Sequence, residues 1–533
     1  MIAALVLLPL VCGAAAFFIR DDRLRRVLLL GVAAAHTALA VAAWTVRPIR
    51  ALDGWLALDS LELLFLLLTS LLSLAASVYA VGYLGREKRP HPPAEDGFLF
   101  SNAPEATFTG CLLLFLGTMT LVTASQHFGL MWVGIEATTL ASAPLIYFHR
   151  SSRSLEAAWK YLVICSVGIA LALLGNFFLV VASTHGHGPL TVSGLMEQAP
   201  SMEPTWLKAA FLLLLVGYGT KMGLAPLHTW LPDAHSEAPS LVSALLSGAL
   251  LNCALLAILR VHAVCGAAGL GDFSGGLLVL FGLLSMGFAA VFMVGQRDYK
   301  RMLAYSSVEH MGIIALGIGV GGMAGFGALL HTVNHSLTKA MLFLLSGNIL
   351  ARYQDKSARR VNGVIHVLPV TGVLWLAGFL AITGTPPFGL FVSEFTILKA
   401  MMEERRWFLA ACYLVFLAVI FAGMASIFLR MAMGRPPWRV LRREGGDDGA
   451  PAGSLPGGTD PSPHDRTRSD PAGGGAPRRA RSLGSRGDPD RREPFLSWIS
   501  PLALGLLTLT LGVYVFPPLQ RAIEAALRAL GGR

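Results

Sequence analysis

Long apolar segments recur along almost the whole chain, and they restrict the possible folds more than any other feature. A helix that crosses the hydrocarbon core of a bilayer needs about 20 apolar residues, and about fourteen segments approach that length. They lie at residues 2–19, 27–46, 59–84, 108–124, 127–148, 158–183, 206–224, 240–262, 275–295, 307–322, 324–350, 365–400, 407–432 and 497–516. Only 14% of the residues are charged, so a water-soluble core could not hide this much apolar surface. We predict an all-α polytopic membrane protein with about fourteen transmembrane helices.

Two of these segments are interrupted by proline. The seventh runs into KMGLAPLHTWLPDAHSEAP (221–239), and the twelfth is cut by TGTPPFG (383–389). Proline lacks the backbone N–H that continues a helix, so we expect breaks at Pro226, Pro232, Pro386 and Pro387. Broken helices that recur in two halves of a membrane protein are typical of a transport site. We therefore predict two repeated halves, with helices 7 and 12 broken.

The segments suggest a division of the chain into five parts. They are N-terminal helices 1–3 (1–105), a first half with helices 4–8 (106–265), a second half with helices 9–13 (266–432), a linking loop (433–496), and a last helix with a tail (497–533). Residues 440–494 are rich in Gly, Pro, Ser, Asp and Arg. Such a composition buries too little apolar surface to fold, so we predict a disordered basic loop.

Basic residues alternate between the two sides of the predicted membrane. Loops after odd-numbered helices are rich in arginine and lysine. Loops after even-numbered helices are poorer, with Arg260 assigned to the loop after the eighth helix. The positive-inside rule then places the arginine-rich loops in the cytoplasm and both termini outside it. The net charge of +10 thus concerns orientation in the plasma (inner) membrane, and no nucleic-acid partner is expected.

Several ionisable residues fall inside apolar segments, where a charge costs about 2.5–3.5 kcal/mol on insertion scales. They are Glu136, Lys221, His228, His331, His335, Lys339 and Glu394. The spacing of His331, His335 and Lys339 places these three on one face of a helix. Hydrogen bonding within a packed core would explain any one of these residues alone. Their recurrence in both halves favours a proton relay.

The proline break beside Lys221 indicates how such a relay could work. A break leaves backbone carbonyls unpaired, and a membrane protein tolerates these only where they line a wet cavity or are buried in protein. A lysine at this point can exchange protons with water. We therefore predict that Glu136 and Lys221 form a movable pair that loads and releases one proton.

The six cysteines are scattered, mostly within apolar segments, and none forms a C-x-x-C pair. This pattern argues against an iron–sulfur or zinc site. No haem, flavin or nucleotide motif is evident either. We expect no metal, no cofactor and no redox active site in this chain.

Four motifs carry a resemblance to a known family. KMGLAPLHTWLPDAHSEAPS, RDYKRMLAYSSVEHMG, HSLTKAMLFLLSG and GLFVSEFTIL resemble signatures of the antiporter-like family. That family comprises the proton-pumping subunits of respiratory complex I, the large Mrp antiporter subunits and the membrane subunits of group 4 hydrogenases. The resemblance covers roughly residues 60–430. Within the family, SSVEHMG and DAHSEAPS are most similar to hydrogenase-4 component F.

The resemblance implies two inverted five-helix repeats and a proton channel in a subunit of an oxidoreductase complex. It aligns Glu136 with the family's fifth-helix glutamate and Lys221 with the seventh-helix lysine that pairs with it. The eleventh-helix motif aligns with His331, His335 and Lys339, and the twelfth-helix exit residue aligns with Glu394. The implied partners are other membrane subunits and, through them, a peripheral redox module.

One position departs from the family pattern. Asn252 stands where complex I subunits carry an eighth-helix lysine, and asparagine cannot hold a proton as a charge. This departure favours a hydrogenase or formate hydrogenlyase-like subunit. Two alternatives remain open: a complex I or Mrp-type antiporter subunit, and a passive scaffold with a vestigial channel.

Overall fold

The computed structural model describes residues 1–46, 49–86, 102–183, 189–436 and 493–530. The helices up to residue 267 are α1 (Ile2–Ala16), α2 (Asp22–Thr45), α3 (Ser60–Arg86), α4 (Glu105–Ala124), α5 (Phe128–Ile146), α6 (Ser152–Ala182), α7 (Val192–Gln198), α8 (Pro204–Met222), α9 (Trp230–Glu237), α10 (Ser240–Leu245) and α11 (Leu251–Ala267). The later helices are α12 (Gly271–Met293), α13 (Tyr299–Val320), α14 (Gly322–Tyr353), α15 (Val364–Val367), α16 (Pro369–Ile382), α17 (Gly389–Glu403), α18 (Trp407–Met433), α20 (Phe495–Val513) and α21 (Pro517–Ala529).

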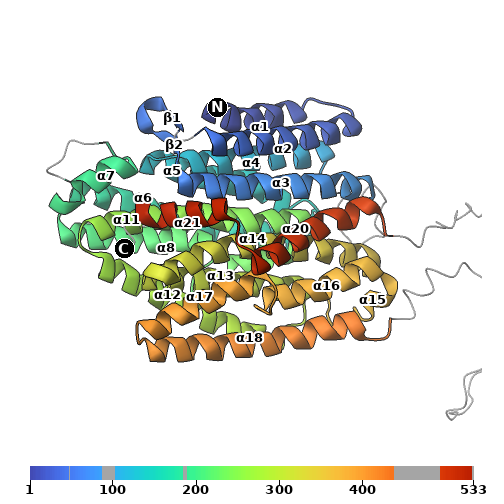
Figure 1. Cartoon of the computed structure of the whole chain (residues 1–533). Coiled ribbons are helices and arrows are strands. Elements are labelled where there is room, and N and C mark those ends of the chain that lie inside the picture. Colours follow the sequence, from blue (N-terminus) through green and yellow to red (C-terminus); the bar gives the residue numbers. More distant parts are fainter. Residues whose placement is uncertain (47–48, 87–101, 184–188, 437–492, 531–533) are drawn as a thin grey trace, which may run out of the picture.

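The long helices pack side by side in one bundle (Figure 1). Among the described residues, ten helices are long and apolar enough to cross a membrane, with Ser240–Ala267 counted as one of them. Two shorter apolar helices, α1 and α16, accompany them. The outer faces carry exposed large apolar side chains such as Trp159, Val291 and Phe408, which suit contact with lipid. The prediction of an all-α polytopic membrane protein is confirmed.

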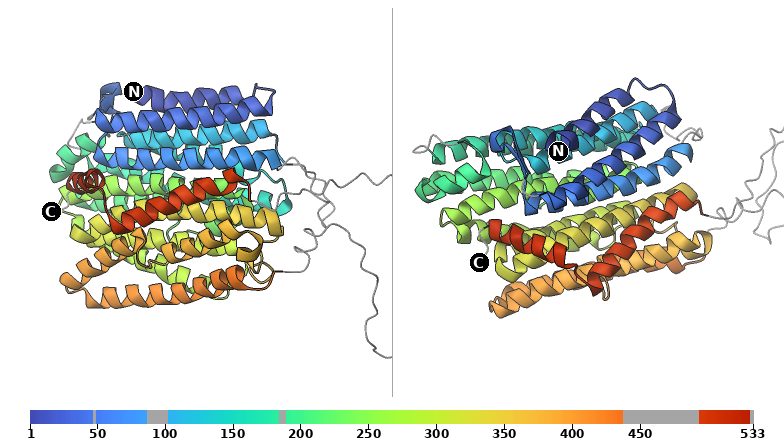
Figure 2. Two further views of the ribbon diagram at one scale, coloured as in Figure 1. Left: turned by 45° about the vertical axis from the view of Figure 1, so that its right-hand side comes forward. Right: turned by 45° about the horizontal axis from the view of Figure 1, so that its top comes forward.

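The start of α1 and the end of α21 lie toward the same end of the bundle (Figure 1). The end of α18 and the start of α20 lie at the opposite end, as both views in Figure 2 also show. The predicted loop 440–494 falls almost entirely outside the described residues.

The first interruption separates α8 from α9. Gly223 ends α8 in the left-handed region, with φ of +85°, a conformation that glycine adopts at little cost. Pro226 lies within the non-helical residues that follow. Pro232 instead lies in the first turn of α9, where its missing N–H removes no helical hydrogen bond.

The second interruption separates α16 from α17 and contains Pro386 and Pro387. Asn334 of α14 donates a hydrogen bond from Nδ2 to the carbonyl oxygen of Gly389, at 2.8 Å. Helix α20 packs directly over the break, because a Cβ on Gly512 would lie 1.9 Å from the carbonyl oxygen of Pro387. Helices α14 and α20 therefore pack against the backbone at this break.

Three features differ from the expectations from sequence. A short antiparallel pair of strands, β1 (Ile49–Ala51) and β2 (Leu56–Leu58), follows α2. The predicted tail forms α21, which packs against α3 and α14. The loop assignment of Arg260 is wrong: it lies within α11, and its Nη2 is 3.1 Å from Oε1 of Glu62 on α3. This buried carboxylate offsets the desolvation of the guanidinium, and Arg260 therefore drops out of the count of loop charges.

Candidate functional site

Lys221 lies at the meeting point of α5, α6 and α8 and is fully buried. Its Nζ donates hydrogen bonds to the Tyr161 hydroxyl at 2.6 Å and to Thr139 Oγ1 at 2.8 Å. The same Nζ lies 4.4 Å from the centroid of the Tyr161 ring, within the range of a cation–π contact. The immediate partners of this buried amine are thus neutral groups.

Glu136 is connected to Lys221 through one hydroxyl. Its Oε2 lies 3.4 Å from Thr139 Oγ1, and its Oε1 accepts a hydrogen bond from Ser166 Oγ at 2.9 Å. No ion pair among the described residues joins Glu136 to Lys221 directly. A hydroxyl can accept one hydrogen bond while it donates another, so Thr139 can relay between the two.

Local sequence explains this arrangement. Thr139 follows Glu136 by three residues on α5, so both lie on the same helix face. Lys221 is the penultimate residue of α8, directly before the break. Beyond the break, Trp230 of α9 donates from Nε1 to the carbonyl oxygen of Thr220 at 2.8 Å. This bond satisfies one of the carbonyls that a helix end leaves free.

The two histidines of the interrupted segment occupy different surroundings. His228 packs among the rings of Phe288, Phe292 and Tyr305, and no described hydrogen bond joins it to another candidate relay residue. His235 is fully buried and stacks on Phe343, with ring centroids 4.9 Å apart. Within the described part of the chain, neither ring nitrogen of His235 has a hydrogen-bond partner.

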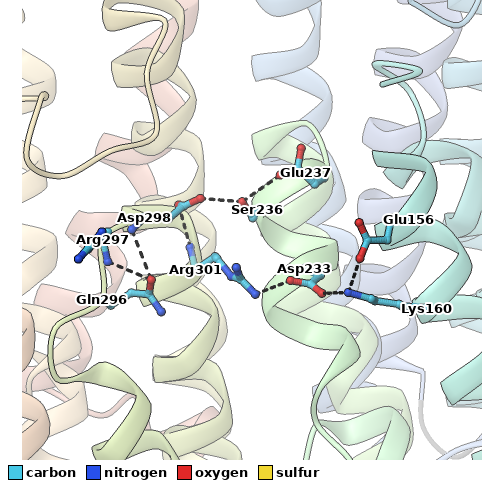
Figure 3. Close-up of polar contacts among 9 residues, drawn as sticks. All are labelled: Glu156, Lys160, Asp233, Ser236, Glu237, Gln296, Arg297, Asp298 and Arg301. Atoms are coloured by element: carbon cyan, nitrogen blue, oxygen red, sulfur yellow. Dashed lines mark hydrogen bonds and ion pairs between the residues drawn. The ribbon is translucent and has the colours of Figure 1, made fainter. Parts of the chain in front are cut away.

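A chain of charged residues ties α9 to α6 and to α13 (Figure 3). Asp233 of α9 pairs with Lys160 of α6 at 3.0 Å and with Arg301 of α13 at 2.5 Å. Ser236 donates to Asp298 at 2.7 Å. Because α6 and α13 belong to different predicted halves, the short helix after the first break is anchored to both.

Asn252 links the two predicted halves in another place. It follows a π-helical turn, Leu246–Leu250, a feature that often marks functional sites. Its Nδ2 donates to Ser336 Oγ of α14 at 2.8 Å. Its Oδ1 is buried, with no hydrogen-bond partner among the described residues. The position therefore retains a polar connection from α11 to α14 without an ionisable group.

Three ionisable residues of α14, His331, His335 and Lys339, face α13, and all three are fully buried. His331 Nε2 lies 2.9 Å from Nδ1 of His310. The ring of His335 lies 5.2 Å from the His310 ring, centroid to centroid. Lys339 donates from Nζ to the carbonyl oxygen of Leu303 at 2.7 Å and to Ser306 Oγ.

Glu394 of α17 lies against the second break. It lines a cavity of about 340 Å³ together with Gly384 of the break and residues of α13 and α18. Gly384 has φ of +59°, and a Cβ there would lie 2.0 Å from Glu394 Oε2. Only glycine leaves room for the carboxyl group. The neighbouring Ser393 bonds through Oγ to His331 Nδ1 at 3.0 Å.

Four buried ionisable residues close to these candidate relay residues were not predicted as site residues: His235, Lys300, Glu309 and His310. Lys300 donates to the carbonyl oxygen of Ala238, at the end of α9, at 2.6 Å. The cost of burying a charge in an apolar segment would have singled out Glu309 and His310, since both lie within the apolar run that forms α13.

One grouping has the spacing of a metal site. His310, His331 and Glu394 each offer one ligand atom, and these atoms lie within 4.8 Å of one another. Zinc–nitrogen bonds of about 2.0–2.1 Å would place two tetrahedral nitrogen ligands roughly 3.4 Å apart. The imidazoles are instead 2.9 Å apart. Their geometry is therefore that of a hydrogen-bonded pair.

A bundle of apolar helices, two of them interrupted and flanked by buried ionisable residues, defines an antiporter-like membrane subunit. The family described as "NADH:quinone oxidoreductase/Mrp antiporter, TM" matches residues 125–421, more than half of the chain. The protein belongs to this family and is a multi-pass membrane protein.

Curated relatives include subunits of several complexes. A hydrogenase-4 component F homolog from Methylacidiphilum infernorum is 39% identical over 386 residues, which cover 71% of this chain and 79% of that protein. Hydrogenase-4 component B from Escherichia coli is 30% identical, over 70% of this chain and 54% of that longer protein. NADH-quinone oxidoreductase subunit N from Desulforudis audaxviator is 32% identical, over 68% of this chain and 71% of that subunit.

Solved structures share the fold at low sequence identity. A chain of the Mrp complex from Dietzia sp. DQ12-45-1b superposes with a TM-score of 0.78 and 21% identity, covering 100% of this chain and 99% of that one. A chain of respiratory complex I from Thermus thermophilus gives a TM-score of 0.76 at 22% identity and covers both chains fully, at 100% each. Both neighbours are parts of multi-subunit membrane complexes.

Proposed function

We propose that this chain is the proton-translocating membrane subunit of a redox-driven complex. The relatives named as hydrogenase-4 components support a group 4 membrane-bound hydrogenase or formate hydrogenlyase-like complex. Other membrane subunits would flank the chain, and a peripheral redox module would drive it. The redox chemistry would then take place outside this subunit.

The environment of Lys221 carries this proposal. The side chain is fully buried, its amine is held by two neutral hydroxyls, and one of these also contacts Glu136. An ammonium in such a place lacks a directly bonded counter-charge, so a proton on it is easily displaced by a change nearby. Movement of Glu136 toward or away from Lys221 would control that proton.

The remaining candidate residues extend the path into the second half. The proposed order is Glu136 and Lys221, then the α14 face with His331, His335 and Lys339, then Glu394. Asn252 and Ser336 would supply a polar bridge between the halves, with water completing it. His228 would serve the relay only after a change of side-chain conformation, because aromatic rings now surround it.

We further propose that the chain crosses the membrane about fourteen times. Helices α1, α8, α14 and the pair α16–α17 would join the ten candidate spans. The halves 106–265 and 266–432 would be inverted repeats, each with one broken helix. The N-terminal helices, the 433–496 loop and the last helix would complete the subunit.

Two other functions remain candidates. A complex I or Mrp-type antiporter subunit has the same fold, and the genes beside this one would distinguish it. Nickel-hydrogenase-like subunits would favour our proposal, an NADH-oxidising module would favour complex I, and small antiporter subunits would favour Mrp. The uncharged Asn252 favours a third candidate, a scaffold with a vestigial channel.

Proton uptake into closed vesicles that contain the whole complex tests the proposal. We expect Glu136→Gln to reduce uptake by about tenfold or more, because the amide cannot bind and release a proton. Glu156→Gln is the matched control, since Glu156 is 63% exposed and pairs with the surface residue Lys160. Equal uptake by both variants, at equal assembly, would refute the relay.

Reporter fusions test the orientation of the chain in the plasma membrane. The arginine-rich loops are expected in the cytoplasm, so a reporter fused at residue 465 should read cytoplasmic. A reporter at the C-terminus should read extracytoplasmic. Readouts on the same side of the membrane would contradict the crossing count.

A further inference from the structure

A cavity beside the second break holds two carboxyl groups from different helices. Its volume is about 340 Å³, and its polar lining comes mainly from Glu309 of α13, Glu394 of α17 and Tyr413 of α18. Most of the other lining residues are leucine, isoleucine and phenylalanine. Such a cavity has room for several water molecules.

Glu309 has no bonded counter-charge in this setting. It is only 3% exposed, and its Oε2 has no hydrogen-bond partner among the described residues. Glu394 is 8% exposed. The Tyr413 hydroxyl is buried and likewise makes no hydrogen bond within the described part of the chain. Two carboxyls and a phenol therefore face one cavity, and no described ion pair includes any of them.

Two carboxylates in apolar surroundings repel each other strongly, because little solvent screens their charges. A pair of carboxyl groups that shares such a site keeps one proton between them rather than ionising twice. Water in the cavity could accept that proton. The cavity thus has the chemistry of a proton-holding site.

Two imidazoles lie close to the Glu394 carboxyl group, since ligand atoms of His310, His331 and Glu394 lie within 4.8 Å of one another. His310 follows Glu309 on α13, and Ser393 precedes Glu394 on α17. His331 of α14 joins them, with Nε2 at 2.9 Å from His310 Nδ1 and Nδ1 at 3.0 Å from Ser393 Oγ. One histidine therefore connects the two helices that carry the carboxyl groups.

We propose that Glu309 and Glu394 form a two-carboxyl site that binds one proton and releases it into the cavity. The resting pair holds one proton. An imidazolium at His310 or His331 would add a second proton to the remaining carboxylate, and one of the two protons would then leave into the cavity. The imidazole would regain a proton from the Lys339 side of α14. This inference rests on the proposed function and adds Glu309 and His310 to its path.

Glu309→Gln in the whole complex provides the first test. Proton uptake into vesicles is expected to fall by about tenfold or more, with assembly unchanged. Glu403→Gln on α17 is the matched control, because Glu403 is 59% exposed. The double variant Glu309→Gln/Glu394→Gln is expected to be no worse than either single change, since the two groups act as a unit. Additive losses would overturn the shared site.

Infrared difference spectroscopy detects protonated carboxyl groups directly. Its signal would not change if Glu309 and Glu394 only stabilised the fold. The C=O stretching band of a protonated carboxyl is expected in the complex and should disappear in Glu309→Gln and in Glu394→Gln. Glu309→Asp, which keeps the carboxyl group, should retain the band and part of the uptake. It also carries the test if the glutamine variant does not assemble. Loss of the band on adding Na⁺ would identify a sodium site and overturn the proposal.

The two proposals fail in different ways. If Lys221→Ala blocks uptake while Glu309→Gln pumps like the wild type, the two-carboxyl site is wrong and the proton channel stands. If Lys221→Ala pumps normally, the channel itself is wrong. A carboxyl band that persists unchanged in both glutamine variants would overturn the two-carboxyl site whatever the transport result.

Discussion

Replacing Lys221 by alanine is expected to stop proton uptake by the assembled complex. A proton that passes without this amine must occupy the buried position as an unsupported charge, at a cost of about 2.5–3.5 kcal/mol on insertion scales. Each 1.36 kcal/mol slows a step tenfold, so the rate should fall by about two orders of magnitude. Assembly should persist, because the protein loses only a side chain whose partners are neutral hydroxyls.

Lys208→Ala is the matched control. Lys208 lies on the same helix, α8, but is exposed. Uptake into vesicles and the amount of assembled complex should be measured for both variants in parallel. The double variant Glu136→Gln/Lys221→Ala should be no slower than either single change, since a linked pair fails as a unit. Normal pumping by fully assembled Lys221→Ala would support the scaffold function instead.

Replacing Gly512 by alanine is expected to destabilise the protein more than other small changes on the last long helix. The new Cβ would lie 1.9 Å from the carbonyl oxygen of Pro387, 2.5 Å from the carbonyl carbon of Phe388 and 2.7 Å from the nitrogen of Gly389. All three are backbone atoms that cannot rotate away. Helix α20 must then move off the break, at a cost of about 1–3 kcal/mol or more, as for other overpacked cores.

Gly505→Ala on the same helix is the control. Its Cβ would meet only the side chain of Met341, at 3.1 Å from Sδ, and methionine adapts readily to small changes in shape. Thermal unfolding of the purified protein in detergent should show a lower midpoint for Gly512→Ala than for Gly505→Ala. Equal midpoints would mean that α20 is not tightly packed on the break.

The interruptions and the α14 face could be predicted because each rests on local chemistry. Proline lacks the backbone N–H that continues a helix, so Pro226, Pro386 and Pro387 marked the breaks within a few residues. Residues four apart on a helix share a face whatever surrounds them, so His331 and Lys339 were expected to point the same way. Both do contact α13.

Contacts between distant helices were harder to predict. Glu136 and Lys221, expected as a direct pair, instead make contact through Thr139, and nothing in either segment indicates that a threonine would lie between them. Arg260 was mistaken for a loop residue because its partner Glu62 lies far away in the sequence. The helix α21 was missed because its few apolar residues do not resemble a membrane span.

The position of α20 also has a consequence for the order in which the protein is made. Asn348 of α14 accepts a hydrogen bond from the Tyr79 hydroxyl of α3 at 3.0 Å and donates one to the carbonyl oxygen of Ser497 of α20 at 2.9 Å. Helix α20 leaves the ribosome long after α3 and α14, yet it covers the backbone at Pro387. A growing chain therefore contains every proposed relay residue before α20 can pack against the break between α16 and α17. A chain whose synthesis stops before α20 therefore contains these ionisable residues but lacks the helix that packs over Pro387.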